Sequence, residues 1–122
     1  MTVGVDLIEI ERIRRALARH GSDFRERCFT QGERAYCDSK PNPAESYAGR
    51  FAGKEAVGKA LGCGVRFTWK EIEIVGRPKP SVKLSGKTAA WAAKVNAGPM
   101  DLSMTHSREM AAAICVMVPG DA

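Results

Sequence analysis

The stretch MTVGVDLIEIERI (residues 1–13) contains one carboxylate, that of Asp6, inside the mostly apolar run of residues 3–8. Val3, Val5 and Leu7 alternate with the residues between them, which predicts a short β-strand because successive strand side chains point to opposite faces. If Asp6 were buried without a partner, it would be strongly destabilising or would stay protonated. Asp6 therefore either faces water, as an ordinary Asp on an edge strand does, or meets a cation or a hydrogen-bond donor.

The composition around this stretch is that of a globular protein. Of the 122 residues, 44% are hydrophobic and 27% are charged, and this length favours one domain spanning residues 1–122. No apolar run approaches the roughly 20 residues of a membrane span, and Asp6 and Glu9 interrupt the apolar stretch that a signal peptide needs. The four cysteines show no C-x-x-C pair and no zinc-ligand spacing, which favours reduced thiols. We therefore expect a cytoplasmic protein without a membrane anchor.

The net charge of +5, from 19 Lys and Arg against 14 Asp and Glu, suits an anionic partner. That partner could be a nucleic acid, a phosphorylated ligand or an acidic protein. Only 7% of the residues are aromatic, and no basic run is interleaved with them. This argues against a platform that stacks the bases of a single strand.

Helix and strand signals follow one another along the chain without a repeat or a dividing linker. Thr30 and Glu33 in FTQGER (residues 29–34) have the spacing of a capping box at a helix start. The expected helices run from residue 10 to a stop at Gly21, from Thr30 onward, and over 44–61 and 87–96. The expected strands cover residues 3–8, 69–75, 82–84, 102–105 and 111–118. Short turns between strands predict an α+β fold with an antiparallel sheet and packed helices.

The helix expected over residues 44–61 contains YAGRFAGKEAVGKALG (residues 47–62), in which neither side is cleanly apolar. Glu55 and Lys59 lie along one side, and Arg50 and Lys54 lie along another. One interpretation is a surface ion pair between Glu55 and Lys59, worth ~0.3–0.5 kcal/mol. In the other, Glu55 joins Asp6 at a hard cation with the basic residues near phosphate, since Mg²⁺ takes one or two carboxylates and completes its shell with water and phosphate oxygens.

Arginines form a stripe on the first helix, nearly opposite its apolar stripe. Arg12, Arg15 and Arg19 make up this arginine stripe, which is either a solvated face or a docking surface. Because every member is Arg and no acidic partner is interleaved, the stripe suits an acidic helix of another protein.

His106 follows the strand DLSMT (residues 101–105) and is surrounded by Thr105, Ser107 and Arg108. A histidine at a strand end is commonly solvent-facing, but these hydrogen-bond donors suit an anion better than a metal. The run SGKT (residues 85–88) lacks the first glycine of a phosphate-binding loop, because Ser81 stands in its place. It is therefore no sign of nucleotide binding.

Together, five segments resemble holo-acyl-carrier-protein synthase, the small bacterial branch of the phosphopantetheinyl transferases. These segments are GVDLIEIERI, FTQGER, GRFAGKEAVGKALGCG, WKEIEIVGRPKPSVKLSG and SMTHSREMAAAICVMV. They occur in the order and at the spacing of that family and span nearly the whole chain.

The resemblance implies an enzyme that moves 4′-phosphopantetheine from coenzyme A to a serine of apo acyl carrier protein. The co-product is adenosine 3′,5′-bisphosphate, and the reaction supports fatty acid or polyketide biosynthesis. Asp6 and Glu55 match the magnesium ligands of the family, and Lys59 matches a lysine at the transferring phosphate. His106 matches a histidine that contacts the phosphates of coenzyme A.

The same resemblance assigns the remaining residues. Glu55 and Lys59 are the expected catalytic residues, and Glu55 is the candidate proton acceptor, directly or through a water. The expected cofactor-binding residues are Arg50, Lys54, Lys59, Thr105 and His106. Arg12 matches an arginine that meets the acidic helix of the carrier protein, and Arg15 and Arg19 extend that surface. The family fold is trimer-forming, with active sites at subunit interfaces, and neither nucleic acid nor a membrane is an expected partner.

Two other interpretations stay open at this point. The first is a non-catalytic module that binds a carrier protein or RNA, although intact Asp6, Glu55 and Lys59 argue against it. The second is the broader transferase branch, whose chains are about twice as long and contain two pseudo-repeats that this chain does not show. One departure from the family pattern is Gly53, where Ala or a larger residue is usual, because glycine inside a helix costs ~1 kcal/mol relative to Ala.

Overall fold

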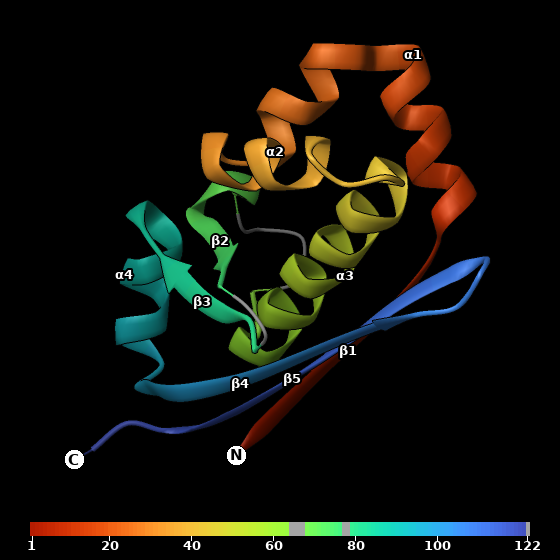
Figure 1. Ribbon diagram of the computed structural model, residues 1–122. Coiled ribbons are helices and arrows are strands. Elements are labelled where there is room, and N and C mark those ends of the chain that lie inside the picture. The colour runs from red at the N-terminus through yellow and green to blue at the C-terminus, as the bar shows by residue number, and fades with distance from the viewer. Residues whose placement is uncertain (64–67, 77–78, 122) are drawn as a thin grey trace.

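The structure is a computed structural model that describes residues 1–63, 68–76 and 79–121. The elements, in chain order, are β1 (Thr2–Glu9), α1 (Ile10–Cys28), α2 (Gln31–Asp38), α3 (Pro43–Leu61), the 3₁₀ turn η2 (Trp69–Glu71), β2 (Ile72–Val75), β3 (Ser81–Leu84), α4 (Gly86–Lys94), β4 (Ala97–His106) and β5 (Met110–Pro119). Figure 1 shows α3 lying across one face of the main sheet, with α1 and α2 beyond it. The strands β2 and β3 and helix α4 lie toward one end of α3.

The strands form two antiparallel sheets, as the short turns predict. The main sheet has the order β1-β5-β4, and the smaller sheet pairs β2 with β3. In the main sheet, Asp6 of β1 lies opposite Ala113 of β5, which in turn lies opposite Met104 of β4. The α+β class with an antiparallel sheet and packed helices is confirmed.

Small residues allow α3 to approach the main sheet closely. Ala48, Ala52, Ala56 and Ala60 are buried along α3. Gly4 of β1 leaves no alternative, because a Cβ there would lie 1.8 Å from the carbonyl oxygen of Ala56. The spacing between β1 and α3 is therefore set by backbone contact.

Gly53 shows why α3 carries a glycine in its interior. A Cβ at this position would lie 2.5 Å from Cδ1 of Ile74 and 3.2 Å from the sulfur of Met104. Gly53 lowers the helix propensity of α3, but it allows α3 to pack tightly against β2 and β4.

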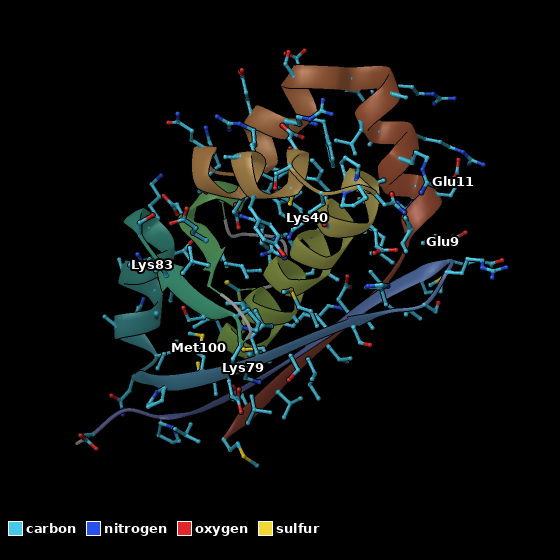
Figure 2. All side chains as sticks on the ribbon, in the orientation of Figure 1. Glu9, Glu11, Lys40, Lys79, Lys83 and Met100 are labelled. Carbon is cyan, nitrogen blue, oxygen red and sulfur yellow. The ribbon has the colours of Figure 1, made fainter. Side chains whose placement is uncertain are left out.

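The two faces of β1 differ in their surroundings. Gly4 and Ile8 are buried and point toward α3 together with the partly buried Asp6. Val3, Val5 and Leu7 point to the opposite face, where they are 53%, 59% and 64% exposed. Side chains on that face of the main sheet project away from the rest of the molecule (Figure 2). The apolar half of the strand pattern is therefore the exposed half.

Most predicted boundaries hold and the capping box forms, but the predicted stop at Gly21 is a kink, after which α1 continues to Cys28. Thr30 and Glu33 exchange both hydrogen bonds of the box, and Gly21 has φ 50° where α1 changes direction. The strand predicted over residues 69–75 begins only at Ile72, because residues 69–71 form the 3₁₀ turn η2. Residues 64–67, 77 and 78 of the predicted loops and turn lie outside the described residues.

Near the other end of the chain, β4 begins at Ala97, five residues before the predicted start at Leu102. It therefore includes Pro99, which lacks an N–H group. Pro99 is tolerated because β4 is an edge strand whose register shifts between Ala97 and Met100.

Candidate functional site

Asp6 has a cationic partner rather than water alone. The side chain of Asp6 is 16% exposed, and its Oδ1 lies 3.2 Å from Nζ of Lys59 on α3. The same ammonium group donates a hydrogen bond of 2.9 Å to the backbone carbonyl of Val5. The close contact between β1 and α3 thus brings together two of the predicted site residues that are 53 positions apart in the chain.

Glu55 lies one helical turn before Lys59 on α3 and is partly buried. Burial raises the pKa of the Glu55 carboxyl, and the nearby Asp6 carboxylate raises it further, while Lys59 acts in the opposite direction. Asp6 and Glu55 are therefore close enough to repel each other. Lys59 forms its ion pair with Asp6 rather than with its helix neighbour Glu55.

The two carboxylates suit a metal ion that is also held by a ligand. Among the described residues, no group of three or more His, Cys, Asp and Glu side chains could hold a metal. Mg²⁺ commonly takes one or two protein carboxylates and fills its other positions with water and phosphate oxygens. Asp6 and Glu55, whose charges influence each other, fit this requirement.

Three of the predicted cofactor-binding residues line one cavity of about 190 Å³. Thr105 and His106 contribute to it from the end of β4, and Arg50 contributes from α3. The guanidinium of Arg50 lies 4.1 Å from the centre of the Tyr36 ring. Arg50 is only 8% exposed, and its Nε has no hydrogen-bond partner among the described residues. The cavity is therefore lined by a largely buried cation, one N–H group of which has no partner in the described part of the chain.

The cavity also contains a residue that the sequence interpretation missed. Oε1 of Glu45, in the first turn of α3, lies 3.2 Å from Nε2 of His106. Glu45, Gly49 and Arg50 follow one another along one side of α3 and all line the cavity. Glu45 lies within the helix predicted over residues 44–61, but no signal in the sequence connects it with His106.

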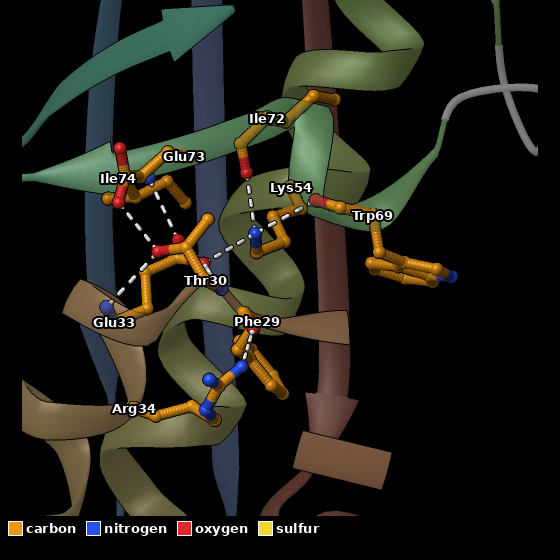
Figure 3. A network of polar contacts seen from close by, with 9 residues as sticks. All are labelled: Phe29, Thr30, Glu33, Arg34, Lys54, Trp69, Ile72, Glu73 and Ile74. Atoms are coloured by element: carbon orange, nitrogen blue, oxygen red, sulfur yellow. Dashed lines mark hydrogen bonds and ion pairs between the residues drawn. The ribbon is translucent and has the colours of Figure 1, made fainter. Parts of the chain in front are cut away.

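Lys54 does not lie where the sequence predicts. Its side chain is fully buried, and Nζ lies 2.7 Å from Oε1 of the equally buried Glu33. The other two donors of this ammonium bind the backbone carbonyls of Trp69 and Ile72, as Figure 3 shows. Burial lowers the pKa of Lys54, and the charge of Glu33 opposes that shift. All three donors of Lys54 are in use, so the prediction that it binds the cofactor is wrong.

Glu33 connects Lys54 to the neighbouring elements. One carboxylate oxygen accepts a hydrogen bond from the backbone N–H of Thr30, and the other accepts one from Ile74. The Thr30 hydroxyl in turn donates to Glu73 at 2.6 Å. This buried network (Figure 3) joins α2 and α3 to β2 and η2. Its role is to hold these elements together.

The arginine stripe is exposed along α1, as predicted. One premise of that prediction is wrong, because an acidic residue does lie beside the stripe. Glu11 pairs with Arg14 at 2.6 Å and approaches Arg15 at 3.9 Å, and its side chain projects outward from α1 (Figure 2). Arg12 and Arg19 are therefore the members best placed to meet an acidic partner.

The start of α4, which contains the SGKT run, is already occupied by a carboxylate. Glu71 accepts hydrogen bonds from the backbone N–H groups of Lys87 and Thr88 and from the Thr88 hydroxyl. The hydrogen bonds from Thr88 lower the pKa of Glu71. The helix N-terminus is thus capped from within the chain.

Comparison with known proteins places this geometry in a family. Residues 2–115 match the model of the 4′-phosphopantetheinyl transferase superfamily. The chain is 46% identical over 117 residues to a holo-[acyl-carrier-protein] synthase of Chlamydia muridarum, covering 93% of this chain and 91% of that protein. It is similar to a Helicobacter pylori holo-[acyl-carrier-protein] synthase solved in complex with coenzyme A (TM-score 0.82, 30% identity, 95% and 99% of the two chains). It is also similar to that of Neisseria meningitidis (TM-score 0.87, 27% identity, 96% and 97%).

Proposed function

This chain belongs to the 4′-phosphopantetheinyl transferase superfamily as an enzyme of the holo-[acyl-carrier-protein] synthase group, and we propose that it transfers 4′-phosphopantetheine from coenzyme A to a serine of apo acyl carrier protein. The transfer requires Mg²⁺, releases adenosine 3′,5′-bisphosphate and serves fatty acid or polyketide biosynthesis in the cytoplasm. The proposal takes residues 1–122 as one transferase domain. None of the helices in the described ranges has the length and apolar character of a bilayer span.

The observation that carries the proposal is the meeting of Asp6, Glu55 and Lys59 where β1 contacts α3. Two carboxylates and one ammonium are the groups that a magnesium-dependent phosphoryl transfer needs. Asp6 and Glu55 would hold the metal, whose charge would neutralise that of the pyrophosphate.

Lys59 is positioned to stabilise charge on the leaving group. Two of its donors bind Val5 and Asp6, which fixes the ammonium group and leaves a third N–H for a phosphate oxygen. During transfer, the serine oxygen bonds to the phosphorus that carries the pantetheine, and the pyrophosphate P–O bond breaks. Its electron pair leaves with adenosine 3′,5′-bisphosphate, so a fixed cation beside that oxygen lowers the barrier.

Glu55 is the candidate acceptor of the serine proton, directly or through a water. In the metal-free protein its pKa is raised by burial and by Asp6. Arg50, Thr105 and His106 would hold the phosphates of coenzyme A in their shared cavity.

Two surfaces support the proposed partners. The exposed arginine stripe suits the acidic helix of a carrier protein, with Arg12 and Arg19 as its main contacts. The uncovered face of the main sheet exposes five aliphatic side chains, namely Val3, Val5, Leu7, Ile114 and Val118. An apolar patch of this kind favours burial against another subunit, and we propose a homotrimer with active sites at the subunit interfaces.

The intact mass of an apo acyl carrier protein tests the function directly. After incubation with this protein, coenzyme A and Mg²⁺, the carrier should gain the mass of one phosphopantetheine group. Asp6→Ala and Glu55→Ala should each abolish the gain, whereas Lys79→Ala, which breaks an exposed ion pair with Asp101, should not. If the folded trimer modifies none of several acidic carrier proteins, the proposed function is wrong.

A further inference from the structure

The cavity that contains Arg50, Thr105 and His106 also holds the carboxylate of Glu45, for which the proposed reaction has no use. Glu45 is the one carboxylate among the described residues that line this cavity. Its Oε1 lies 3.2 Å from Nε2 of His106. Glu45 lies in the first turn of α3, where the helix dipole favours a carboxylate, and it lines the cavity where an incoming anion would bind.

A phosphate and the Glu45 carboxylate compete for the same hydrogen bond. Nε2 of His106 carries at most one hydrogen, in the neutral or the protonated ring. That hydrogen can be donated to Glu45 or to a ligand oxygen. An anion that binds Nε2 of His106 beside the Arg50 side chain must therefore displace Glu45.

The contact between Glu45 and His106 is weak enough for a ligand to replace it. The two side chains are 32% and 52% exposed, and solvent-exposed ion pairs are weak because water and salt screen them. Space is available beside the pair, since a Cβ at Gly49 would meet nothing within 4 Å. By contrast, the ion pair between Glu33 and Lys54 is fully buried and has no such freedom.

We propose that Glu45 is an internal substitute for a ligand phosphate, which occupies His106 in the free enzyme and gives way to the co-substrate. This inference rests on the proposed function, because it takes that phosphate to belong to coenzyme A. An anion with a single negative charge gains little binding free energy by displacing a carboxylate of the same charge. A doubly charged phosphate monoester gains more, because charge-assisted hydrogen bonds strengthen with the charge of the acceptor. Glu45 therefore lowers the affinity of the cavity for any anion that uses Nε2 of His106, and a doubly charged phosphate overcomes that cost most readily.

Calorimetric titration of the whole protein with two nucleotides tests this role without a carrier protein or a metal. The probes are adenosine 3′,5′-bisphosphate, which has two monoester phosphates, and adenosine 3′,5′-cyclic monophosphate, which has a single negative charge. Glu45→Gln should bind the bisphosphate roughly 3- to 5-fold more tightly than the wild type, as expected when a weak competing contact is removed. The cyclic nucleotide should gain by no more than the same factor, because Glu45→Gln removes the same competing contact for both probes.

Two variants make the result specific to the contact with His106. Glu26→Gln removes the same charge from an exposed site on α1 that does not line the cavity, and its affinities should match the wild type within twofold. In a His106→Gln background, Glu45→Gln should lose most of its effect. Equal gains with and without His106 would overturn the proposal, because the effect would then be one of overall charge.

The remaining outcomes also decide the question. If Glu45→Gln binds the bisphosphate no better than the wild type, or if neither protein binds it, Glu45 is not a competitor and the inference fails. The intact-mass assay tests the proposed function independently of these affinities. A carrier protein that gains phosphopantetheine while Glu45→Gln leaves both affinities unchanged would refute the role of Glu45 alone.

Discussion

Helix α3 carries two lysines five positions apart, and each forms an ion pair with a carboxylate from another element. Lys54 and Glu33 are completely buried, and all three donors of the lysine are in use. Lys59 is 47% exposed, and its pair with Asp6 leaves one donor available. The same pair of charges is thus fully hydrogen-bonded inside the fold at Lys54, and at Lys59 it keeps an exposed donor that a ligand could use.

The largest expected effect comes from breaking the buried pair. Lys54→Ala leaves the Glu33 carboxylate buried without its cation, and removing one partner of such a pair costs about 3–5 kcal/mol in the free energy of unfolding. Urea unfolding followed by circular dichroism measures this loss. Lys59→Ala, the matched change at the exposed pair, should lower the free energy of unfolding by less than about 1 kcal/mol. Similar losses for the two variants would invalidate the distinction between the pairs.

For the exposed pair, the expected effect is on catalysis rather than on stability. Lys59→Ala should lower kcat by roughly 10²–10³-fold, because it removes a fixed donor from the charge that develops on the leaving group. The rate of phosphopantetheine transfer, followed by intact mass, provides the readout. Lys79→Ala serves as the control, since Lys79 forms a comparable exposed pair with Asp101 at 2.8 Å. Full activity in Lys59→Ala would assign the exposed pair a structural role too.

The third prediction concerns the repulsion between Glu55 and Asp6. Because the folded-state pKa of Glu55 is raised above its ordinary value of 4.5, the unfolded chain releases this proton at lower pH than the folded protein does. Stability contributed by protonated Glu55 is therefore lost as the pH rises from 4.5 through the folded-state pKa. Without metal at neutral pH, Glu55→Gln should be more stable than the wild type by less than about 1 kcal/mol, after allowance for solvent screening.

The same variant provides a test of magnesium binding that does not depend on activity. A ligand that binds the folded state alone raises the melting temperature. Millimolar Mg²⁺ should therefore raise the melting temperature of the wild type and leave that of Glu55→Gln unchanged. An equal response in both proteins would place the metal elsewhere.

The smallest expected effect is at Glu71, which lies in the same 3₁₀ turn as Trp69, a partner of Lys54. Glu71→Gln weakens the cap of α4 and should lower the melting temperature slightly at neutral pH. Since the pKa of Glu71 is lowered by its hydrogen bonds, the stabilisation is present above pH 4.5 and is lost as the pH falls through the folded-state pKa. Melting curves of the two proteins should converge in acid. A loss as large as that of Lys54→Ala would mean that Glu71, rather than Lys54, holds this turn.

The sequence alone identifies the exposed pair better than the buried one. Asp6, Glu55 and Lys59 stand out because charged residues interrupt apolar patterns, and that signal is local. Nothing local separates Lys54 from Lys59, since both follow small residues on one helix. Lys54 is buried because Glu33 and the carbonyls of Trp69 and Ile72 surround it. Those partners come from distant parts of the chain, and only the tertiary fold brings them together.

Glu45 escaped the sequence interpretation for a related reason. An acidic residue in the first turn of a helix has a sufficient local explanation in the helix dipole. Its meeting with His106 depends on where β4 ends relative to α3. The outward direction of Val3, Val5 and Leu7 could not be predicted either, because period-two alternation gives two faces without saying which one is covered.

Gly4 has a consequence for how the enzyme tolerates mutation. A Cβ at this position would collide with the backbone of α3, so nearly any substitution must push β1 and the helix apart. Asp6 would then move away from Glu55 and Lys59 while every one of the three side chains remained intact. We expect a random screen for inactive variants to recover position 4 alongside the charged residues. The most sensitive point of the site would then be a residue with no side chain and no chemistry of its own.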